Sequence, residues 1–278
     1  MQPDTQKHWL RCPRFDELRA ECPDLLSWID DAPSCVVLHL LAPRSPFALL
    51  LKRYFLDLPD LSKCFHSLPR TGIRNQLFTD GSFFKGFVFN LDRAAWAVVN
   101  ASTNQTISYG CVPGILQTIG RAELLAIISA VEWAVAHDTL ITIWTDSAST
   151  CSRANLLLQQ PRAAFLAGEN HDLWQRLAEA LERTAFEQVI ICWTPSHIDV
   201  ACCDTSQEEF LATWNDIVDT LAVTTNRDRG CFFAQLAEEA EAYYQLWQHR
   251  LQSLRKFYLK IAEVKKEEID TTDLTFEP

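Results

Sequence analysis

The sequence of this 278-residue chain lacks the features of secreted and membrane-spanning proteins. Its cysteines lie scattered between Cys12 and Cys231 and include no C-x-x-C pair, so reduced thiols are expected rather than a disulfide framework. Residues 1–30 show no basic segment followed by an apolar one, which argues against a secretory signal. The longest apolar runs, "CVVLHLLAP" and "FALLL", are too short to cross a bilayer. We therefore expect an intracellular protein, cytoplasmic or nuclear, that makes no membrane contact.

The sequence also lacks an excess of basic residues. The net charge of −11 argues against a protein that holds nucleic acid through a large basic patch. It does not exclude a protein that meets phosphate through bound metal ions. At 48% apolar content the chain is able to bury a sizeable core, and its length predicts one main domain with flanking pieces.

The pattern of the chain changes twice. Residues 1–72 carry short helical patterns broken by prolines, which indicates a helical N-terminal extension. Residues 73–228 begin with three strand-like runs and continue with alternating helices and strands, the pattern of a mixed-sheet α/β domain. Residues 229–278 carry apolar side chains four and three apart. They predict an amphipathic helix over 231–267, which either packs on its own chain or contacts a protein partner or a second copy.

Two aspartates follow predicted strands. Asp80 comes after "QLFT" and before Gly81, so we expect it where a strand ends and the backbone turns. Asp146 follows "LITIWT" and precedes Ser147, where an aspartate can also act only as the N-cap of the next helix. If both aspartates lie at the carboxyl ends of strands in one sheet, they can face each other across a crevice.

A third carboxylate belongs to the helical pattern "RAELLAIISAVEWAVAHD". We expect Glu123 in the first turn of this helix, beside its apolar face. A glutamate in a first turn is often only a partner for the helix dipole. If the helix packs on the sheet, however, Glu123 points towards the strand ends.

The stretch "WNDIVDTLAV" holds two further aspartates on one predicted helix. A helical wheel places Asp219 on the flank of the apolar face, about 130° from its centre, and Asp216 almost opposite, at about 170°. Asn215 shares the flank with Asp219. We therefore expect Asp219 to reach a site at the edge of the core and Asp216 to face water. The apolar face is predicted to consist of Trp214, Ile217, Val218, Leu221 and Ala222.

Carboxylates gathered in one crevice repel each other unless cations neutralise them. Ligation by oxygen alone selects hard ions such as Mg²⁺ or Mn²⁺. Two such ions about 3.5–4 Å apart can activate a water molecule and stabilise the leaving oxygen when a phosphodiester is cleaved.

The motifs "FTDGS", "RAEL", "TDS", "DLWQRL", "WTPSHID" and "WNDIVDTLAV" follow one another in an order that resembles type 1 ribonuclease H, particularly the domains carried by retroelement polyproteins. The resemblance covers roughly residues 74–228. It implies a ribonuclease H-like fold, in which helices flank a five-stranded mixed sheet. It also implies endonucleolytic cleavage of the RNA strand of RNA·DNA hybrids with two Mg²⁺ ions, for which Mn²⁺ can substitute.

Carried over residue by residue, the resemblance implies specific roles. His197 matches a mobile histidine that assists proton transfer or product release. Ser82 and Thr118 fall where contacts to the hybrid backbone are expected, and recognition of the RNA strand depends on its 2′-hydroxyl groups. The implied metal ligands are Asp80, Glu123, Asp146 and Asp219.

Several features depart from the family pattern. The segment after "TDGS" lacks a glycine-rich turn, and the loop that follows His197 is long and acidic. The acidic loop, together with the single Arg and the absence of Lys in "LLLQQPRAAFLAGENHDLW", leaves open a catalytically silent protein that binds hybrids or serves as a scaffold. Other nucleases of this fold are a further alternative, although exonucleases usually begin with D-x-E and integrases place their glutamate on a late helix. At the N-terminus, His8 and Cys12 resemble half of a zinc-binding segment found between reverse transcriptase and ribonuclease H in some retroelements, but no C-x-x-C precedes them in this chain. The resemblance implies that residues 1–72 are a retroelement connector remnant, and a vestigial segment without metal is favoured over a working zinc site.

Overall fold

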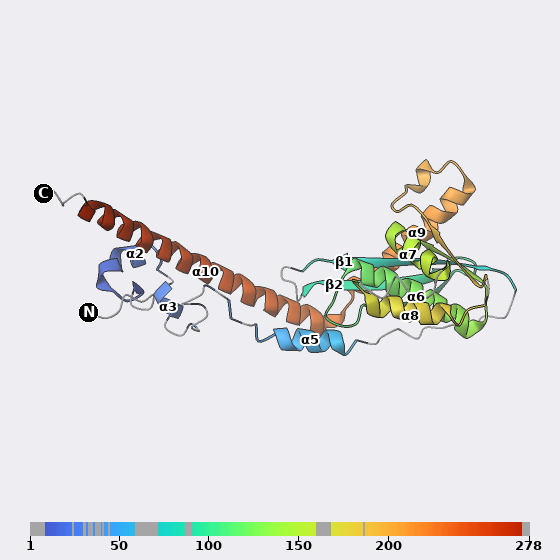
Figure 1. Cartoon of the computed structure of the whole chain (residues 1–278), viewed down its shortest axis with the longest axis horizontal. Helices are drawn as coiled ribbons and strands as arrows, with labels where there is room; N and C mark the ends of the chain where they lie inside the picture. The colour runs from blue at the N-terminus through green and yellow to red at the C-terminus, as the bar shows by residue number, and fades with distance from the viewer. Residues whose placement is uncertain are drawn as a thin grey trace. The chain divides into compact units, whose positions relative to one another are not determined.

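The structure is a computed structural model that describes most of the chain. The described residues are 9–23, 25–29, 32, 36, 40, 42–43, 45–58, 72–86, 91–159, 168–185 and 187–273. The chain divides into two compact units, which we describe separately: Met1–Ala48 with Leu236–Pro278, and Leu49–Gln235 (Figure 1). In the described part of the chain, no helix is long and apolar enough to span a membrane.

The larger unit is built on five strands: β1 (Asn75–Phe84), β2 (Arg93–Asn100), β3 (Gln105–Cys111), β4 (Ile141–Thr145) and β5 (Val189–Trp193). They form one sheet in the order β3-β2-β1-β4-β5. β1 pairs antiparallel with β2, and β2 with β3, whereas β1, β4 and β5 run parallel to one another. The predicted α/β fold with a five-stranded mixed sheet is therefore confirmed.

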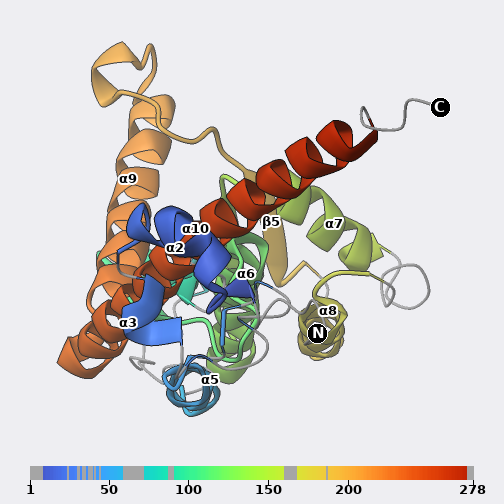
Figure 2. The same cartoon turned by 90° about the vertical axis from the view of Figure 1, so that its left-hand side faces the viewer.

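The helices of this unit are α5 (Ala48–Leu56), α6 (Ile119–His137), α7 (Ala148–Gln159), α8 (His171–Leu181) and α9 (Ser206–Arg227), with the short 3₁₀ helix η3 (Val200–Cys202). The Thr118 side chain accepts the backbone N–H of Arg121 at the start of α6. Thr205 and Glu208 form a capping box at the start of α9. Figure 2 shows α9 on one side of the domain and α7 and α8 on the other.

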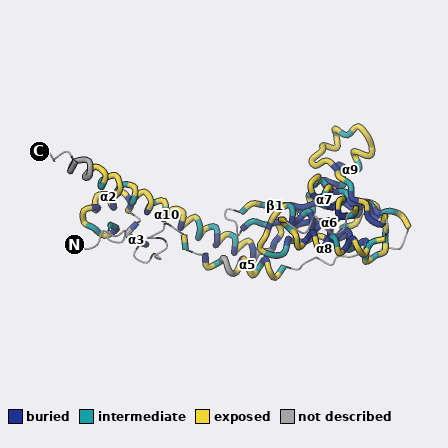
Figure 3. The backbone as a smooth tube through the Cα atoms, viewed as in Figure 1, coloured by how far each residue is buried: buried dark blue, intermediate teal, exposed yellow. Residues whose placement is uncertain are grey.

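The sheet has a different core on each face. Side chains of β1 alternate between the faces, so Leu77 packs beneath α6 while Phe78 packs beneath α9. The α6 face holds a large and mainly aliphatic cluster in which Trp96 and Trp133 are fully buried. The α9 face holds a smaller cluster that includes Phe78, Val218 and Ala222. Figure 3 shows the buried residues in dark blue.

The smaller unit combines an N-terminal and a C-terminal segment in one core. The N-terminal part forms η1 (Pro13–Phe15), α2 (Asp16–Ala20) and α3 (Leu25–Ile29), and the C-terminal part belongs to α10 (Gly230–Asp273). The Trp28 and Trp247 rings meet edge to face, with their centroids 6.0 Å apart. The helix predicted over 231–267 is thus present, and its apolar stripe packs against N-terminal residues, including Leu25 and Phe15.

Two predictions about these terminal segments stay predictions. A protein partner for α10 is one of them, since the structure contains a single chain. The other concerns zinc: Cys12 is half-buried beside the apolar core of the smaller unit. His8, its predicted companion, lies outside the described residues.

Candidate active site

Asp80 and Asp146 occupy equivalent places on neighbouring strands. The last parallel pair of β1 and β4 is Thr79 with Thr145, and each aspartate is the next residue of its chain segment. Asp80 is only 5% exposed. The predicted strand end at Asp80 is wrong, because β1 continues through Phe84 in its antiparallel pairing with β2. Asp80 instead lies inside a strand, at the point where its parallel neighbour stops.

Gly81 has a packing role rather than a turn role. A Cβ atom at this position would lie 2.7 Å from the Glu123 backbone nitrogen and 2.8 Å from Ala122 Cβ. Only glycine therefore lets α6 approach β1 so closely. This close approach brings Glu123 of α6 next to Asp80 of β1.

Glu123 lies one turn further into its helix than expected. Because α6 begins at Ile119, Glu123 belongs to the second turn, where the helix dipole has little effect. Its Oε2 accepts hydrogen bonds from Ser147 Oγ at 2.5 Å and Thr150 Oγ1 at 3.0 Å. Burial raises the pKa of the Glu123 carboxyl group, the two hydroxyl groups lower it, and Asp146 raises it.

Asp146 lies one residue before the cap of α7. The carbonyl oxygen of Ser147 accepts the backbone N–H of Cys151, so Ser147 occupies the N-cap position and Asp146 precedes it. Burial raises the pKa of the Asp146 carboxyl group, as does Asp219, whereas His197 and a hydrogen bond from the Asn215 side chain lower it. Asp146 is thus linked electrostatically to the loop after β5 and to α9.

On α9, Asp219 is half-buried and Asp216 is exposed, which matches the helical wheel. The predicted apolar face is wrong at one position, because Ile217 is 40% exposed. Asn215, only 4% exposed, takes the place that the wheel gave to apolar residues. Its Oδ1 has no hydrogen-bond partner among the described residues. The buried face of α9 is therefore centred on the polar side chain of Asn215, which is directed towards Asp146.

His197 lies in the loop that follows β5 and has a left-handed backbone with φ of 52°. It lines a small hollow together with Asn215, Asp216 and Asp219. The imidazole lowers the pKa of the Asp146 carboxyl group. The predicted histidine thus lies beside two of the predicted acids.

The four predicted carboxylates form one electrostatic cluster centred on Asp80. Its pKa rises to about 9, first because of burial, next because of Asp146, and then because of Asp219 and Glu123, while the Gly81 N–H lowers it. In donor type and in charge, such a cluster fits hard divalent cations. As the side chains stand, however, no group of three or more His, Cys, Asp or Glu among the described residues is arranged to hold a metal ion.

The two residues predicted to contact nucleic acid have different surroundings. Thr118 is exposed at the start of α6. Ser82 is buried, and its hydroxyl group donates to the Ala222 carbonyl oxygen at 2.8 Å. This bond fixes α9 one turn beyond Asp219. A contact to the hybrid backbone stays a prediction for both residues, and the Ser82 hydroxyl group already has a partner within the protein.

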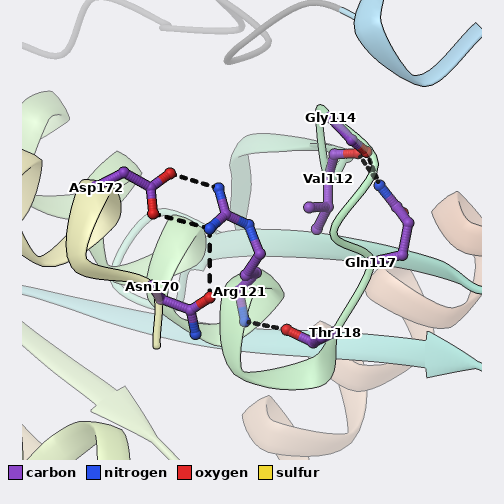
Figure 4. A network of polar contacts seen from close by, with 7 residues as sticks. All are labelled: Val112, Gly114, Gln117, Thr118, Arg121, Asn170 and Asp172. Carbon is purple, nitrogen blue, oxygen red and sulfur yellow. Dashed lines mark hydrogen bonds and ion pairs between the residues drawn. The ribbon is translucent and has the colours of Figure 1, made fainter. Parts of the chain in front are cut away.

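Sequence reasoning missed the polar network that fixes the N-terminal end of α6 (Figure 4). Arg121 is buried and donates two hydrogen bonds to Asp172 at the start of α8, at 2.9 and 2.7 Å. Gln117 donates to the carbonyl oxygens of Val112 and Gly114, both at 2.7 Å. The only sequence signal was the presence of "RAEL" and "DLWQRL" among the motifs. The network holds α6 and the loop before it, and so it fixes the helix that carries Glu123.

A five-stranded mixed sheet with acids gathered at the carboxyl edge of its parallel strands defines the ribonuclease H-like class of folds. The ribonuclease H family matches residues 74–226, more than half of the chain, so the chain belongs to this family. The resemblance inferred from the motifs is confirmed. Membership places the chain among the ribonuclease H hydrolases, nucleases that act on RNA·DNA hybrids.

Several solved structures are similar to this chain. The ribonuclease H domain of prototype foamy virus is 20% identical, with a TM-score of 0.44, and the match covers 55% of this chain and 94% of that one. A foamy viral protease–reverse transcriptase in complex with RNA/DNA hybrid is 18% identical, with a TM-score of 0.43, over 59% of this chain and 21% of that one. RNase H1 from the halophilic archaeon Halobacterium salinarum is 19% identical, with a TM-score of 0.34, over 56% and 99%. No curated protein sequence matches.

Proposed function

We propose that this chain is a retroelement-type endonuclease that hydrolyses the RNA strand of RNA·DNA hybrids with two Mg²⁺ ions, or with Mn²⁺ in their place. The observation that supports this most strongly is the carboxylate cluster that raises the pKa of Asp80 to about 9. Crowded, buried acids are ionised together only when cations accompany them. Membership of the ribonuclease H family supports the same reaction.

Asp80, Glu123, Asp146 and Asp219 are the residues that would hold the ions, because hard cations prefer carboxylate oxygens. When bound, such ions activate water and stabilise the leaving oxygen of a phosphodiester. The fold supports this assignment, because Asp80 and Asp146 follow the last parallel pair of β1 and β4, and Asp80 also interacts electrostatically with Asp219 on α9 and Glu123 on α6. His197, beside Asp146, is suited to moving a proton or assisting product release.

Substrate binding is proposed to depend little on basic side chains. The net charge is −11, the loop after His197 carries Asp199 and Asp204, and the first turn of α9 carries Glu208 and Glu209. Non-specific affinity for nucleic acid should therefore be low and sensitive to salt. The exposed Thr118 at the start of α6 is a proposed contact to the hybrid backbone, where recognition of the RNA strand depends on its 2′-hydroxyl groups.

A cleavage assay tests this function. Purified protein is incubated with labelled RNA·DNA hybrid, duplex DNA and single strands, each with Mg²⁺, Mn²⁺ or a chelator. We expect cleavage of the hybrid alone, only with a divalent ion, and only in the RNA strand. Asp80→Asn serves as the inactive control. If the wild-type protein leaves the hybrid intact while a known ribonuclease H cuts it, the proposed function is wrong.

A second candidate function is a silent hybrid-binding or scaffold protein. It is favoured by the observation that, across the described residues, no three acids are arranged to hold an ion as they stand. Titration calorimetry separates the two candidates. Binding of two Mg²⁺ ions that is lost in Asp80→Asn would count against the silent protein, whereas hybrid binding without any Mg²⁺ uptake would support it.

A further inference from the structure

Two hydroxyl groups at the start of α7 hold the Glu123 carboxylate. Ser147 Oγ and Thr150 Oγ1 lie 2.5 and 3.0 Å from the same oxygen, Oε2. The two hydroxyl oxygens lie 2.8 Å from each other, so the three atoms form a closed triangle. Ser147 directly follows Asp146, and Thr150 lies one turn later in α7. The triangle therefore joins α6 to the segment that carries Asp146.

Thr150 takes part in every proton arrangement that the triangle allows. Each hydroxyl group has one proton, and an ionised carboxylate has none, so two protons serve the three contacts of the triangle. In two of the three possible arrangements Thr150 donates directly to Oε2, and in the third it donates to Ser147, which in turn donates to Oε2. Thr150 is only 5% exposed, so water does not readily replace its partners. Loss of the Thr150 hydroxyl group would leave Ser147 alone to hold Glu123.

The triangle acts on only one of the two carboxylate oxygens. Among the described residues, the hydrogen bonds to Glu123 all reach Oε2. Oε1 therefore carries no bond that would compete with a ligand. A carboxylate fixed through one oxygen and free at the other has the arrangement of an oriented metal ligand, whose supporting partners typically change metal affinity by about 10–100-fold when they are removed.

We propose that Ser147 and Thr150 are positioning residues, which hold Glu123 through Oε2 so that its Oε1 is presented to a divalent cation in the carboxylate cluster. This inference rests on the proposed function, and Thr150 is its most specific element. Ser147 also occupies the N-cap position of α7, so a change there has two effects at once. Thr150 lies within the helix, and replacement by valine removes the hydroxyl group while keeping the side-chain shape.

The experiment compares Thr150→Val with Thr150→Ser, which keeps the hydroxyl group. Thr142→Val is the matched control, because Thr142 is a buried threonine on β4 that takes no part in the triangle. Three quantities are measured: Mg²⁺ affinity by titration calorimetry, kcat and KM for hybrid cleavage, and the carboxyl ¹³C NMR signal of Glu123, assigned with Glu123→Gln. Melting curves confirm that each variant is folded.

We expect Thr150→Val to weaken Mg²⁺ binding and to lower kcat, each by about tenfold. KM for the hybrid should stay unchanged, and the Glu123 signal should move. Thr150→Ser and Thr142→Val should stay within about twofold of the wild type, with the Glu123 signal in place. A Thr150→Val protein that matches the wild type in Mg²⁺ affinity and NMR signal would overturn the proposal. An equal loss in Thr142→Val would overturn it too, because the effect would then be one of general packing.

Failure of the proposed function would look different. In that case the wild-type protein would neither bind Mg²⁺ nor cut the hybrid. The NMR signal would still test whether Thr150 positions Glu123, because the signal reports on Glu123 without any metal. A signal that moves in Thr150→Val but not in Thr150→Ser supports the positioning role, and an unmoved signal overturns it.

Discussion

The two faces of the central sheet hold their helices by different means. On one face, α6 approaches β1 so closely that its backbone lies against Gly81, and hydroxyl groups from α7 hold Glu123. On the other face, α9 packs on a smaller cluster with Phe78 and is tied to β1 by the hydrogen bond from Ser82. Each face contributes acids to the same edge of the sheet. The site therefore lies where two packing layers meet, and the α6 layer holds the larger apolar cluster.

Asp80 lies where the two layers meet and interacts with the three other acids, so its replacement should have the largest effect on cleavage. Asp80→Asn removes the carboxylate that interacts with Asp146, Asp219 and Glu123. Asp80 is a metal ligand in the proposed function, and loss of such a ligand removes several kcal/mol of transition-state stabilisation, so cleavage should fall by at least about 100-fold. Single-turnover cleavage of a labelled hybrid measures this. Residual activity above a tenth of the wild-type rate would contradict the central position of Asp80.

The raised pKa of Asp80 predicts how the stability of the metal-free protein depends on pH. Because the pKa of Asp80 rises from 3.8 to about 9 on folding, the folded state keeps a proton that the unfolded state releases between these values. The free energy of unfolding should therefore fall as pH rises across that interval. Asp80→Asn should flatten this fall, and Mg²⁺ should oppose it. Urea unfolding between pH 4 and pH 9 measures the slope, and identical slopes in both proteins would refute the prediction.

On the α9 face, two aspartates three residues apart should behave oppositely. Asp219 is half-buried and interacts with Asp80 and Asp146, whereas Asp216 is exposed. Asp219→Asn should lower cleavage by about 100-fold. Asp216→Asn should stay within about threefold of the wild type, since exposed substitutions rarely disturb a fold. Both rates come from one hybrid cleavage series, in which equal losses would remove the distinction.

On the α6 face, a single methyl group added at Gly81 should push α6 away from β1. In Gly81→Ala the new Cβ atom would lie 2.7 Å from the Glu123 nitrogen, so α6 must shift. Overpacking of this kind costs about 1–3 kcal/mol of stability, which denaturant unfolding measures. Cleavage should fall as well, because Glu123 moves with the helix. Wild-type stability in this variant would show that α6 has more freedom than its close approach indicates.

Of the two substitutions that disturb packing on the sheet, the one at the hydrogen bond between β1 and α9 should have the smaller effect. Ser82→Ala removes the hydrogen bond to the Ala222 carbonyl oxygen, which should cost about 1 kcal/mol. Cleavage should decrease only a few-fold, since the apolar contacts of Phe78 and Val218 still hold α9. Chemical denaturation and a rate measurement on the same sample check both values. A loss as large as that of Gly81→Ala would mean that the two faces are equally constrained.

The sequence predicted the parts of the fold that depend on local patterns. Strands and helices were expected in their observed order, and Asp80 and Asp146 were expected near the carboxyl ends of strands. The error at Gly81 has a physical reason: an Asp-Gly pair in a turn and a glycine that admits a helix look alike until the helix is in place. Ile217 was assigned to the buried face because a wheel counts apolar residues, whereas the true face is centred on Asn215.

The triangle around Glu123 could not be predicted for a similar reason. It joins residues of α6 and α7 that are distant in the sequence, and its geometry depends on how the two helices meet at the sheet. Serine and threonine at the start of a helix are ordinary capping residues, so nothing local marks Thr150. The acids themselves were found because their chemistry requires several of them together.

One measurement tests the central claim most directly: cleavage of a labelled RNA·DNA hybrid by the purified protein, compared with Asp80→Asn, in the presence and absence of Mg²⁺. If the carboxylate cluster forms a metal-dependent active site, the wild-type protein cuts the RNA strand with Mg²⁺ and stops when a chelator is added, and Asp80→Asn leaves the hybrid intact. An uncut hybrid with the wild-type protein, or equal cleavage by Asp80→Asn, would contradict it.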